Sequence, residues 1–202
     1  MAKNISHKNI KYFINNEIKK SKINFNIILA SKSPRRIEIL NQLGLDFQIV
    51  PSSFNEKTLT IKNPIEFAKI ASLNKAKVVA DKFKNSLVIA ADTIVVLNNR
   101  IIGKPNSKED AIEILQKLSN NIHEVITGFS MIKLDDNIEI TDHDITKVTF
   151  RKLDTNEIEE YITEYEPYDK AGAYGIQDMK AVLVKKIDGC SFNVLGFPLS
   201  KH

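Results

Sequence analysis

The sequence predicts a mixed α/β protein in which strands alternate with helices early in the chain and pair as hairpins later. Three observations carry this prediction. Short apolar runs at 24–30 and 47–50 flank a helical pattern, and 87–97 is the strongest strand pattern. Residues 125–134 and 138–150 are typical of one long hairpin. Elements in this order favour a mixed, twisted sheet with flanking helices over a regular doubly wound one.

Helix starts are marked by polar residues whose side chains accept bonds from the free N–H groups of a first turn. The expected N-caps are Ser33, Asn63, Ser107 and Asp154. After Ser107 and Asp154, an acid three residues later in the chain predicts capping boxes at Asp110 and Glu157. A glycine-rich loop at 169–177 follows the last of these helices, and strands are expected from there to Leu195.

The positive charge of the chain is concentrated at one end. The net charge is +4, but residues 1–22 alone hold six lysines and one glutamate, a charge of +5 that leaves −1 for the rest. A nearly neutral body argues against a broad nucleic-acid surface. We therefore expect a basic extension at 1–22, either a solvated, partly helical arm or one that binds a partner or an anion. A single domain is expected at 23–202.

Several classes of protein are excluded by patterns that the sequence lacks. No stretch approaches the roughly 18 apolar residues of a membrane span, and the N-terminus lacks a signal-peptide pattern. Cys190 is the single cysteine, so no internal disulfide is expected. The four histidines show no metal-ligand spacing, and neither a Walker loop nor a Gly-x-Ser-x-Gly elbow occurs. We expect a cytoplasmic protein without nucleic-acid or membrane partners.

The segment Ser-Lys-Ser-Pro-Arg-Arg at 31–36 joins the first strand to the first helix. A helix start exposes unpaired N–H groups and a partial positive charge. Arg35 and Arg36 therefore have the wrong sign for this position unless an anion binds there. The segment is either a phosphate site or a helix start with two arginines directed into solvent.

Asp92 interrupts the apolar run at 87–97. A carboxylate there is costly unless it is paired or bound to a metal. It is either a structural residue, satisfied by partners or placed at a strand end in solvent, or a Mg²⁺ ligand or general base. If the chain turns at 98–99, Lys104 returns to within a few residues of Asp92. Lys104 is then either half of a surface ion pair or a ligand for a triphosphate.

The loop at 169–177 reads Asp-Lys-Ala-Gly-Ala-Tyr-Gly-Ile-Gln. Its small residues allow the backbone to approach a ligand closely. Gln177 at its end carries an amide that can both donate to and accept from a base or a phosphate. Loops of this composition are common, so this pattern by itself leaves the role of the loop open.

Taken together, these segments resemble the Maf family of nucleoside triphosphate pyrophosphatases. The likeness runs from about residue 27 to 199. The matching segments are 29–36 (Leu-Ala-Ser-Lys-Ser-Pro-Arg-Arg), 91–93 (Ala-Asp-Thr), 103–105 (Gly-Lys-Pro), 125–128 (Val-Ile-Thr-Gly), 169–177 and 193–199 (Asn-Val-Leu-Gly-Phe-Pro-Leu).

The resemblance implies a fold like that of inosine triphosphatases, with two lobes around a cleft. It implies hydrolysis of nucleoside triphosphates between the α and β phosphates, with Mg²⁺ or Mn²⁺ as cofactor, by a single catalytic domain that forms a homodimer. The loop at 169–177 is similar to that of the branch that prefers dTTP and UTP, including modified uridine triphosphates. Two alternatives stay open: the sister branch that cleaves 7-methyl-GTP, and a nucleotide-responsive regulator of cell division with little catalysis.

The resemblance also implies roles for individual residues. Asp92 would accept a proton from the attacking water and, with Glu56, bind the metal. Lys104 and Glu56 would complete the catalytic group. The substrate-binding residues would be Ser31, Ser33, Arg35, Arg36, Lys75, Thr93 and Gln177, of which Arg35, Thr93 and Gln177 would influence the choice of substrate.

The chain departs from the family pattern at three places. Asn55 stands beside Glu56 where relatives often have an acid, which would weaken metal binding. Asp178 follows Gln177 where relatives usually have glycine. The family's C-terminal helix is not expected after Leu199, and one hypothesis is that a helix of the basic extension packs in its place.

Overall fold

The computed structural model describes residues 26–178 and 183–199. These residues form a seven-stranded mixed sheet in the order β2-β1-β3-β5-β6-β7, with β4 paired to β3. The mixed α/β class is thereby confirmed. The strands are β1 (Ile27–Leu29), β2 (Phe47–Ile49), β3 (Leu87–Leu97), β4 (Arg100–Ile102), β5 (Ile122–Lys133), β6 (Ile138–Phe150) and β7 (Val184–Asp188).

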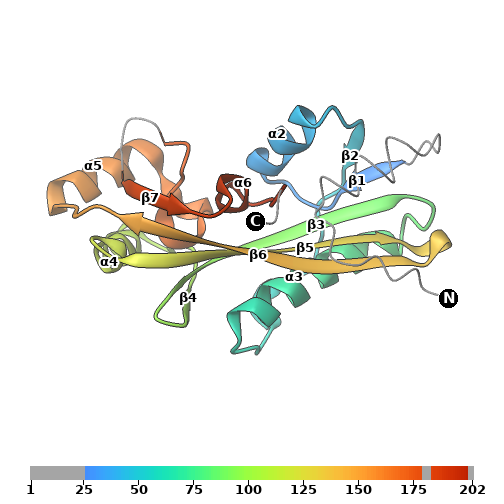
Figure 1. The fold of residues 1–202 in the computed structure, drawn as a ribbon, viewed down its shortest axis with the longest axis horizontal. Coiled ribbons are helices and arrows are strands. Elements are labelled where there is room, and N and C mark those ends of the chain that lie inside the picture. The colour runs from blue at the N-terminus through green and yellow to red at the C-terminus, as the bar shows by residue number, and fades with distance from the viewer. Residues whose placement is uncertain (1–25, 179–182, 200–202) are drawn as a thin grey trace.

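Helices lie on both faces of the sheet. α3 crosses one face, and α2 and α6 lie on the other (Figure 1). The helices are α2 (Pro34–Gln42), α3 (Pro64–Ala80), α4 (Lys108–Leu118), α5 (Thr155–Tyr165) and α6 (Ser191–Leu195). Short 3₁₀ turns are η2 (Glu56–Thr58), η3 (Leu134–Asp136), η4 (Pro167–Asp169) and η5 (Ala171–Ala173). None of the helices in the described ranges is both long and apolar enough to span a membrane.

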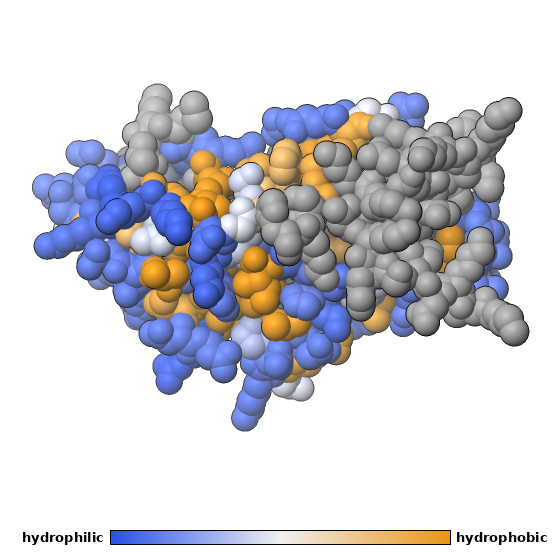
Figure 2. Space-filling model, viewed as in Figure 1, coloured by the Kyte–Doolittle hydropathy of each residue, from blue (hydrophilic) through white to orange (hydrophobic). Residues whose placement is uncertain are grey.

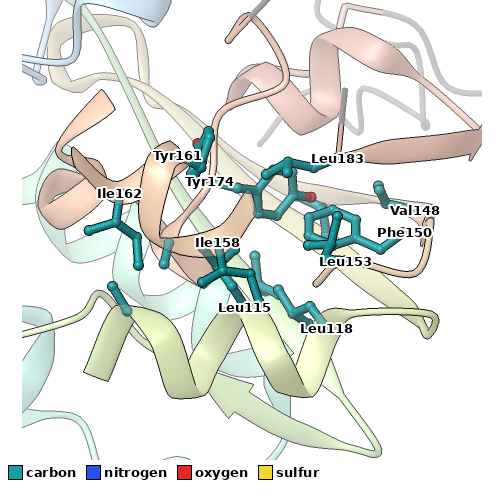
Figure 3. Packing of buried hydrophobic residues seen from close by; sticks show 14 residues of the cluster. Leu115, Leu118, Val148, Phe150, Leu153, Ile158, Tyr161, Ile162, Tyr174 and Leu183 are labelled. Carbon is teal, nitrogen blue, oxygen red and sulfur yellow. The ribbon is translucent and has the colours of Figure 1, made fainter. Parts of the chain in front are cut away.

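The long strands β3, β5 and β6 run the length of the molecule and connect two hydrophobic clusters (Figure 1). One cluster packs α2 and the start of β3 around Leu40 and Ile89. The other packs α4 and α5 against the far ends of the same strands. Figure 3 shows Leu115 and Leu118 of α4 directed toward Ile158 of α5. These two clusters lie toward opposite ends of the long strands, in a molecule for which the family resemblance implied two lobes.

The edge of β3 changes partner halfway along its length. On that edge β1 pairs in parallel with Leu87–Ile89, and β4 pairs antiparallel with Val95–Leu97. The interval between them, which contains Asp92, pairs with neither strand. On the opposite edge β5 pairs with β3 throughout, from Val88 to Val96. A break in strand pairing of this kind opens the sheet edge for side chains from the flanking loops.

Most of the expected elements are present. Asn63, Ser107 and Asp154 accept the bonds expected of helix caps, and the capping box at Asp154 and Glu157 is complete. The turn after β3 has both Asn98 and Asn99 at positive φ, a backbone region that asparagine tolerates better than most residues.

Three local expectations are wrong. The Asp110 carboxylate accepts from the backbone N–H of Asn106 instead of returning to its cap, so no reciprocal box forms there. Ser33 occupies the N-cap position of α2, but its side chain caps no described N–H group. The chain after β7 is helical in α6, which the sequence analysis assigned to a strand. The basic extension expected at 1–22, and the hypothesis that its helix packs in place of a C-terminal helix, lie outside the described residues.

Candidate active site

Asp92 and Thr93 lie side by side in β3 and face opposite sides of the sheet, because successive strand residues alternate. Asp92 pairs with Gly128 of β5, and Thr93 pairs with Thr127. Asp92 is contacted by a residue of α3, whereas Thr93 is contacted by a residue of α2. The site therefore has two networks, one on each face of β3. Below they are called the carboxylate network (Glu56, Lys75, Asp92) and the hydroxyl network (Ser31, Arg36, Thr93, Thr127).

The carboxylate network is centred on an ammonium group. Lys75 Nζ lies 2.6 Å from Asp92 Oδ1 and 3.3 Å from Glu56 Oε2. The Asp92 side chain is 9% exposed and that of Glu56 is 34% exposed. The ion pair offsets the free-energy cost of burying Asp92 in an apolar strand. The network thus has one buried carboxylate and one that solvent or a ligand can reach.

Several charges and bonds act on Glu56. Burial raises the pKa of its carboxyl, but a backbone hydrogen bond and the positive charges of Lys75 and Lys104 bring the pKa below its ordinary value. Lys104 is exposed, so its side chain is accessible from solvent. Asn55 precedes Glu56 and accepts from the backbone N–H of Lys57, which caps the short turn η2. Asn55 therefore helps to position Glu56.

Small residues bring α3 close enough to the sheet for Lys75 to reach Asp92. A Cβ on Gly128 would lie 2.2 Å from the carbonyl oxygen of Ala68, so only glycine fits beneath the helix backbone. One turn further along α3, the Ser72 hydroxyl lies 3.1 Å from the Ser130 hydroxyl of β5. The close approach of α3 to β5 fixes the height of Lys75 above β3.

The hydroxyl network holds Arg36 at the start of α2. The guanidinium donates from Nε to the Gly196 carbonyl at 2.8 Å. It also donates to Ser31 Oγ at 3.2 Å and to Thr93 Oγ1 at 3.0 Å. Burial lowers the pKa of Arg36 to about 10, with the negative charge of Asp92 opposing that shift. The guanidinium is therefore protonated at neutral pH.

The direction of the hydrogen bonds behind Arg36 follows from counting protons. The Thr127 hydroxyl donates to the Asn193 carbonyl at 2.9 Å. Since a hydroxyl has one proton, Thr93, whose oxygen lies 2.9 Å from that of Thr127, must be the donor between the two. The lone pairs of Thr93 then face Arg36. The chain of donors runs from Arg36 through the strands to α6.

The sequence predicted no role for three residues that belong to this network or bind its members. Thr127 and Asn193 lie within segments that carried the family resemblance, but nothing in their local pattern predicts a bond between them. Gly196 has φ +104°, which favours glycine, and its carbonyl accepts from Arg36. The signal available in the sequence was the glycine at 196, three residues after Asn193, which is typical of the end of a helix.

The loop at 169–177 is attached to both the α2 and β4 sides of the site. Asp169 Oδ2 lies 4.0 Å from Arg35 Nη1. The N–H of Gly172 donates to the Gly103 carbonyl at 3.1 Å, next to Lys104 in the chain. Gln177 is exposed in the turn that follows. The loop therefore begins beside the predicted phosphate-binding segment and beside Lys104.

Most of the predicted site residues are brought together. The two networks include Ser31, Arg36, Glu56, Lys75, Asp92 and Thr93, and the charges of Arg35 and Lys104 act on members of them. Ser33 contributes its backbone N–H, which donates to Ser31 Oγ at 3.2 Å. Within the described ranges, Gln177 forms no hydrogen bond or ion pair with either network. The roles assigned to these residues stay predictions.

The donor set of the carboxylate network fits a hard divalent cation. Glu56 and Asp92 both direct an oxygen toward a single cation, the Lys75 ammonium. Mg²⁺ is typically held by one or two carboxylates together with substrate phosphates and water. No group of three or more His, Cys, Asp or Glu side chains suited to a metal occurs in the part of the chain that the structure describes. Two carboxylates fit a divalent cation of this kind when phosphate and water complete its coordination.

The fold thus places a basic helix start near the carboxylates of Asp92 and Glu56. The family model for Maf-like proteins matches residues 26–202. The chain belongs to the Maf-like protein family.

Curated relatives match most of the chain. A dTTP/UTP pyrophosphatase of Clostridium perfringens is 46% identical over 177 residues, which cover 87% of this chain and 92% of the relative. Another of Clostridium botulinum is 47% identical over 180 residues, with 87% and 93% covered. Among solved structures, the Ham1 protein of Staphylococcus aureus is 16% identical with a TM-score of 0.43, covering 62% of this chain and 71% of that chain.

Proposed function

We propose that this protein is a nucleoside triphosphate pyrophosphatase that hydrolyses dTTP and UTP to the monophosphate and pyrophosphate. The observation that carries the proposal is the buried Asp92 carboxylate, held by Lys75 at 2.6 Å beside Glu56 and within the electrostatic range of Arg36. The names of the 46% identical relatives support the same activity and substrates. The proposed catalytic domain spans 23–202 and acts as a homodimer in the cytoplasm.

The proposed reaction is an in-line attack of water on the α-phosphorus. Asp92 accepts the proton of that water as the new P–O bond forms. The bond from the α-phosphorus to the bridging oxygen breaks, and pyrophosphate leaves with the bonding electrons. Most of the acceleration comes from positioning and from charge compensation of the phosphates.

The side chains divide this work by position. Arg36 and the N–H groups at the start of α2 bind phosphate oxygens. Lys104 compensates charge from the β4 side, and Lys75 keeps Asp92 in place. Glu56 and Asp92 would hold Mg²⁺ or Mn²⁺, which supplies further charge compensation at the phosphates when bound. Gln177 and Thr93 contribute to the choice of base.

The test is pyrophosphate release from dTTP, UTP, CTP, GTP, ATP and 7-methyl-GTP with Mg²⁺ or Mn²⁺. We expect release from dTTP and UTP, and a loss of at least about a thousandfold in kcat for Asp92→Asn, because the base is removed. Nucleotide binding should persist in this variant. Full activity of Asp92→Asn would refute the assignment of the base. If the wild type binds nucleotides without hydrolysing them, the result would favour a regulatory protein. If it prefers 7-methyl-GTP, the result would favour the activity of the sister branch.

A further inference from the structure

The turn that carries Gln177 is closed by a neighbouring carboxylate. The backbone N–H of Asp178 donates to the Gly175 carbonyl at 3.3 Å, which makes residues 175–178 a four-residue turn with Gln177 in its third position. The side chain of Asp178 returns to the start of the same turn, where Oδ2 accepts from the Gly175 N–H at 3.0 Å. Both the backbone and the side chain of Asp178 therefore bind Gly175.

The same carboxylate connects the turn to the hydrophobic core. Asp178 Oδ2 accepts from the Tyr161 hydroxyl, whose oxygen also lies 3.0 Å from the Gly175 nitrogen. Tyr161 is 2% exposed and lies in the α4–α5 cluster near Ile158 (Figure 3). Its ring stacks on Tyr165 with centroids 5.0 Å apart. The anchor of the turn is therefore a fixed part of α5.

Glycine at 175 is required by this arrangement. A Cβ on Gly175 would lie 2.7 Å from Asp178 Oδ2, so a side chain there would displace the carboxylate. Burial and the bond to Asp178 raise the pKa of Tyr161 above its ordinary value, so the phenol keeps its proton and stays a donor. Tyr161, Gly175 and Asp178 thus form a closed set of bonds at the base of the Gln177 turn.

We propose that Asp178 is a positioning residue for substrate selection, which holds Gln177 in its binding orientation by fixing the 175–178 turn to Tyr161. This proposal rests on the proposed function, in which the amide of Gln177 contacts the base of the nucleotide. The face of the molecule in Figure 2 carries hydrophilic residues with hydrophobic patches between them, and Gln177 is itself exposed. An exposed amide in such a setting needs a fixed backbone to discriminate between bases.

A double-mutant cycle tests whether Asp178 acts through Gln177. The variants are Asp178→Ala, Gln177→Ala and the combination, measured for kcat and KM with dTTP and CTP. We expect Asp178→Ala to raise KM for dTTP about tenfold, with a smaller change in kcat, and to reduce the preference for dTTP over CTP. In the Gln177→Ala background the same substitution should have no further effect. Equal effects in both backgrounds would overturn the proposal.

Three further variants separate positioning from stability. Tyr161→Phe removes the donor from the other end and should reproduce the change in preference. Asp178→Asn keeps an acceptor oxygen and should therefore retain part of the preference for dTTP over CTP that Asp178→Ala loses. Asp136→Ala applies the same truncation to an exposed aspartate paired with Lys133 at the far hairpin turn and should leave KM unchanged. A changed preference in Asp136→Ala, or an unchanged one in Tyr161→Phe, would contradict the proposal.

Amide hydrogen exchange gives a readout that does not depend on hydrolysis. The N–H of Gly175 should be protected in the wild type and exchange faster in Asp178→Ala. Equal exchange in the two proteins would overturn the fixed turn even if the enzyme is active. The wild type could also release no pyrophosphate from any nucleotide while Asp178→Ala loses protection at Gly175. That result would establish the fixed turn and refute the proposed function.

Discussion

The two faces of β3 use different chemistry to support one site. On the α3 face, the carboxylate network consists of charges, with Lys75 between Asp92 and Glu56. On the α2 face, the hydroxyl network consists of neutral donors and acceptors that end at one guanidinium. The networks meet where the pairing of β3 changes from β1 to β4. Both networks therefore lie along the stretch of β3 that neither β1 nor β4 pairs with.

Asp92 and Thr93 are adjacent in one strand, but we expect them to affect different steps, chemistry in one case and binding in the other. A charged group can act on a reacting atom at a distance of several ångströms, whereas a hydroxyl acts through contact. We therefore expect substitutions in the carboxylate network to affect mainly kcat, and those in the hydroxyl network mainly KM. The predictions below test this division.

Among the substitutions that test this difference between the two faces, removing the charge of Lys75 should have the largest effect. Lys75→Met leaves Asp92 and Glu56 without their shared cation, and we expect kcat to fall at least about a hundredfold. Steady-state kinetics with dTTP measures it. Lys69→Met is the matched control, because Lys69 on the same helix forms an exposed pair with Glu66 at 3.2 Å. Equal losses in both variants would mean that α3 has only a structural role.

Adding a methyl group at Gly128 should have the next largest effect. The Cβ of Gly128→Ala would lie 2.2 Å from the Ala68 carbonyl oxygen, and α3 must move away to accept it. We expect the free energy of unfolding to fall by about 3 kcal/mol, with a fall in kcat as Lys75 leaves Asp92. Urea denaturation and kinetics measure the two effects. Gly103→Ala, whose Cβ meets no atom within 4 Å, should change stability little. A stable and fully active Gly128→Ala protein would contradict the role of the close approach.

Breaking the hydroxyl network should have a smaller effect of a different kind. Thr127→Val keeps the shape of the side chain but removes the hydroxyl that donates to the Asn193 carbonyl and accepts from the Thr93 hydroxyl. We expect a loss of about 2 kcal/mol in stability and a rise in KM larger than the change in kcat. Thr127→Ser should restore both quantities. A fall in kcat at constant KM would remove the proposed division between the two faces.

The smallest effect on stability at neutral pH is expected for a substitution of His123, which lies on β5 and faces the same side of the sheet as Thr127. Burial lowers its pKa to about 4, and its Nε2 lies 2.8 Å from the Tyr174 hydroxyl. The unfolded chain binds a proton near pH 6.5, and the folded protein does so only near 4, so stability should fall as the pH decreases between these values.

The variant His123→Gln keeps a hydrogen-bonding group near Nε2 and lacks the titration. Its stability should be close to that of the wild type at pH 7 and should vary less between pH 6.5 and 4, as measured by denaturation at a series of pH values. Parallel pH curves for the two proteins would assign the loss of stability to other groups.

Local patterns predicted much of the fold and part of the site. Alternation and capping residues placed β3, the β5–β6 hairpin and α5, because these depend on neighbours in the chain. The helix α6 was missed, since it has five residues and few local signals. Its position is set by contacts such as the bond from Asn193 Nδ2 to the Val125 carbonyl at 2.9 Å, between residues far apart in sequence.

The sequence by itself determined that a buried strand would contain a carboxylate and that a helix start would carry two arginines. It also determined the family, through the order of its segments. The tertiary structure decided that Lys75 is the partner of Asp92, that Thr93 faces away from it, and that Asp178 binds Tyr161. These contacts depend on strand register and on the distance of α3 from the sheet. Both are set by packing between segments that are distant in the chain, so no local sequence pattern predicts them.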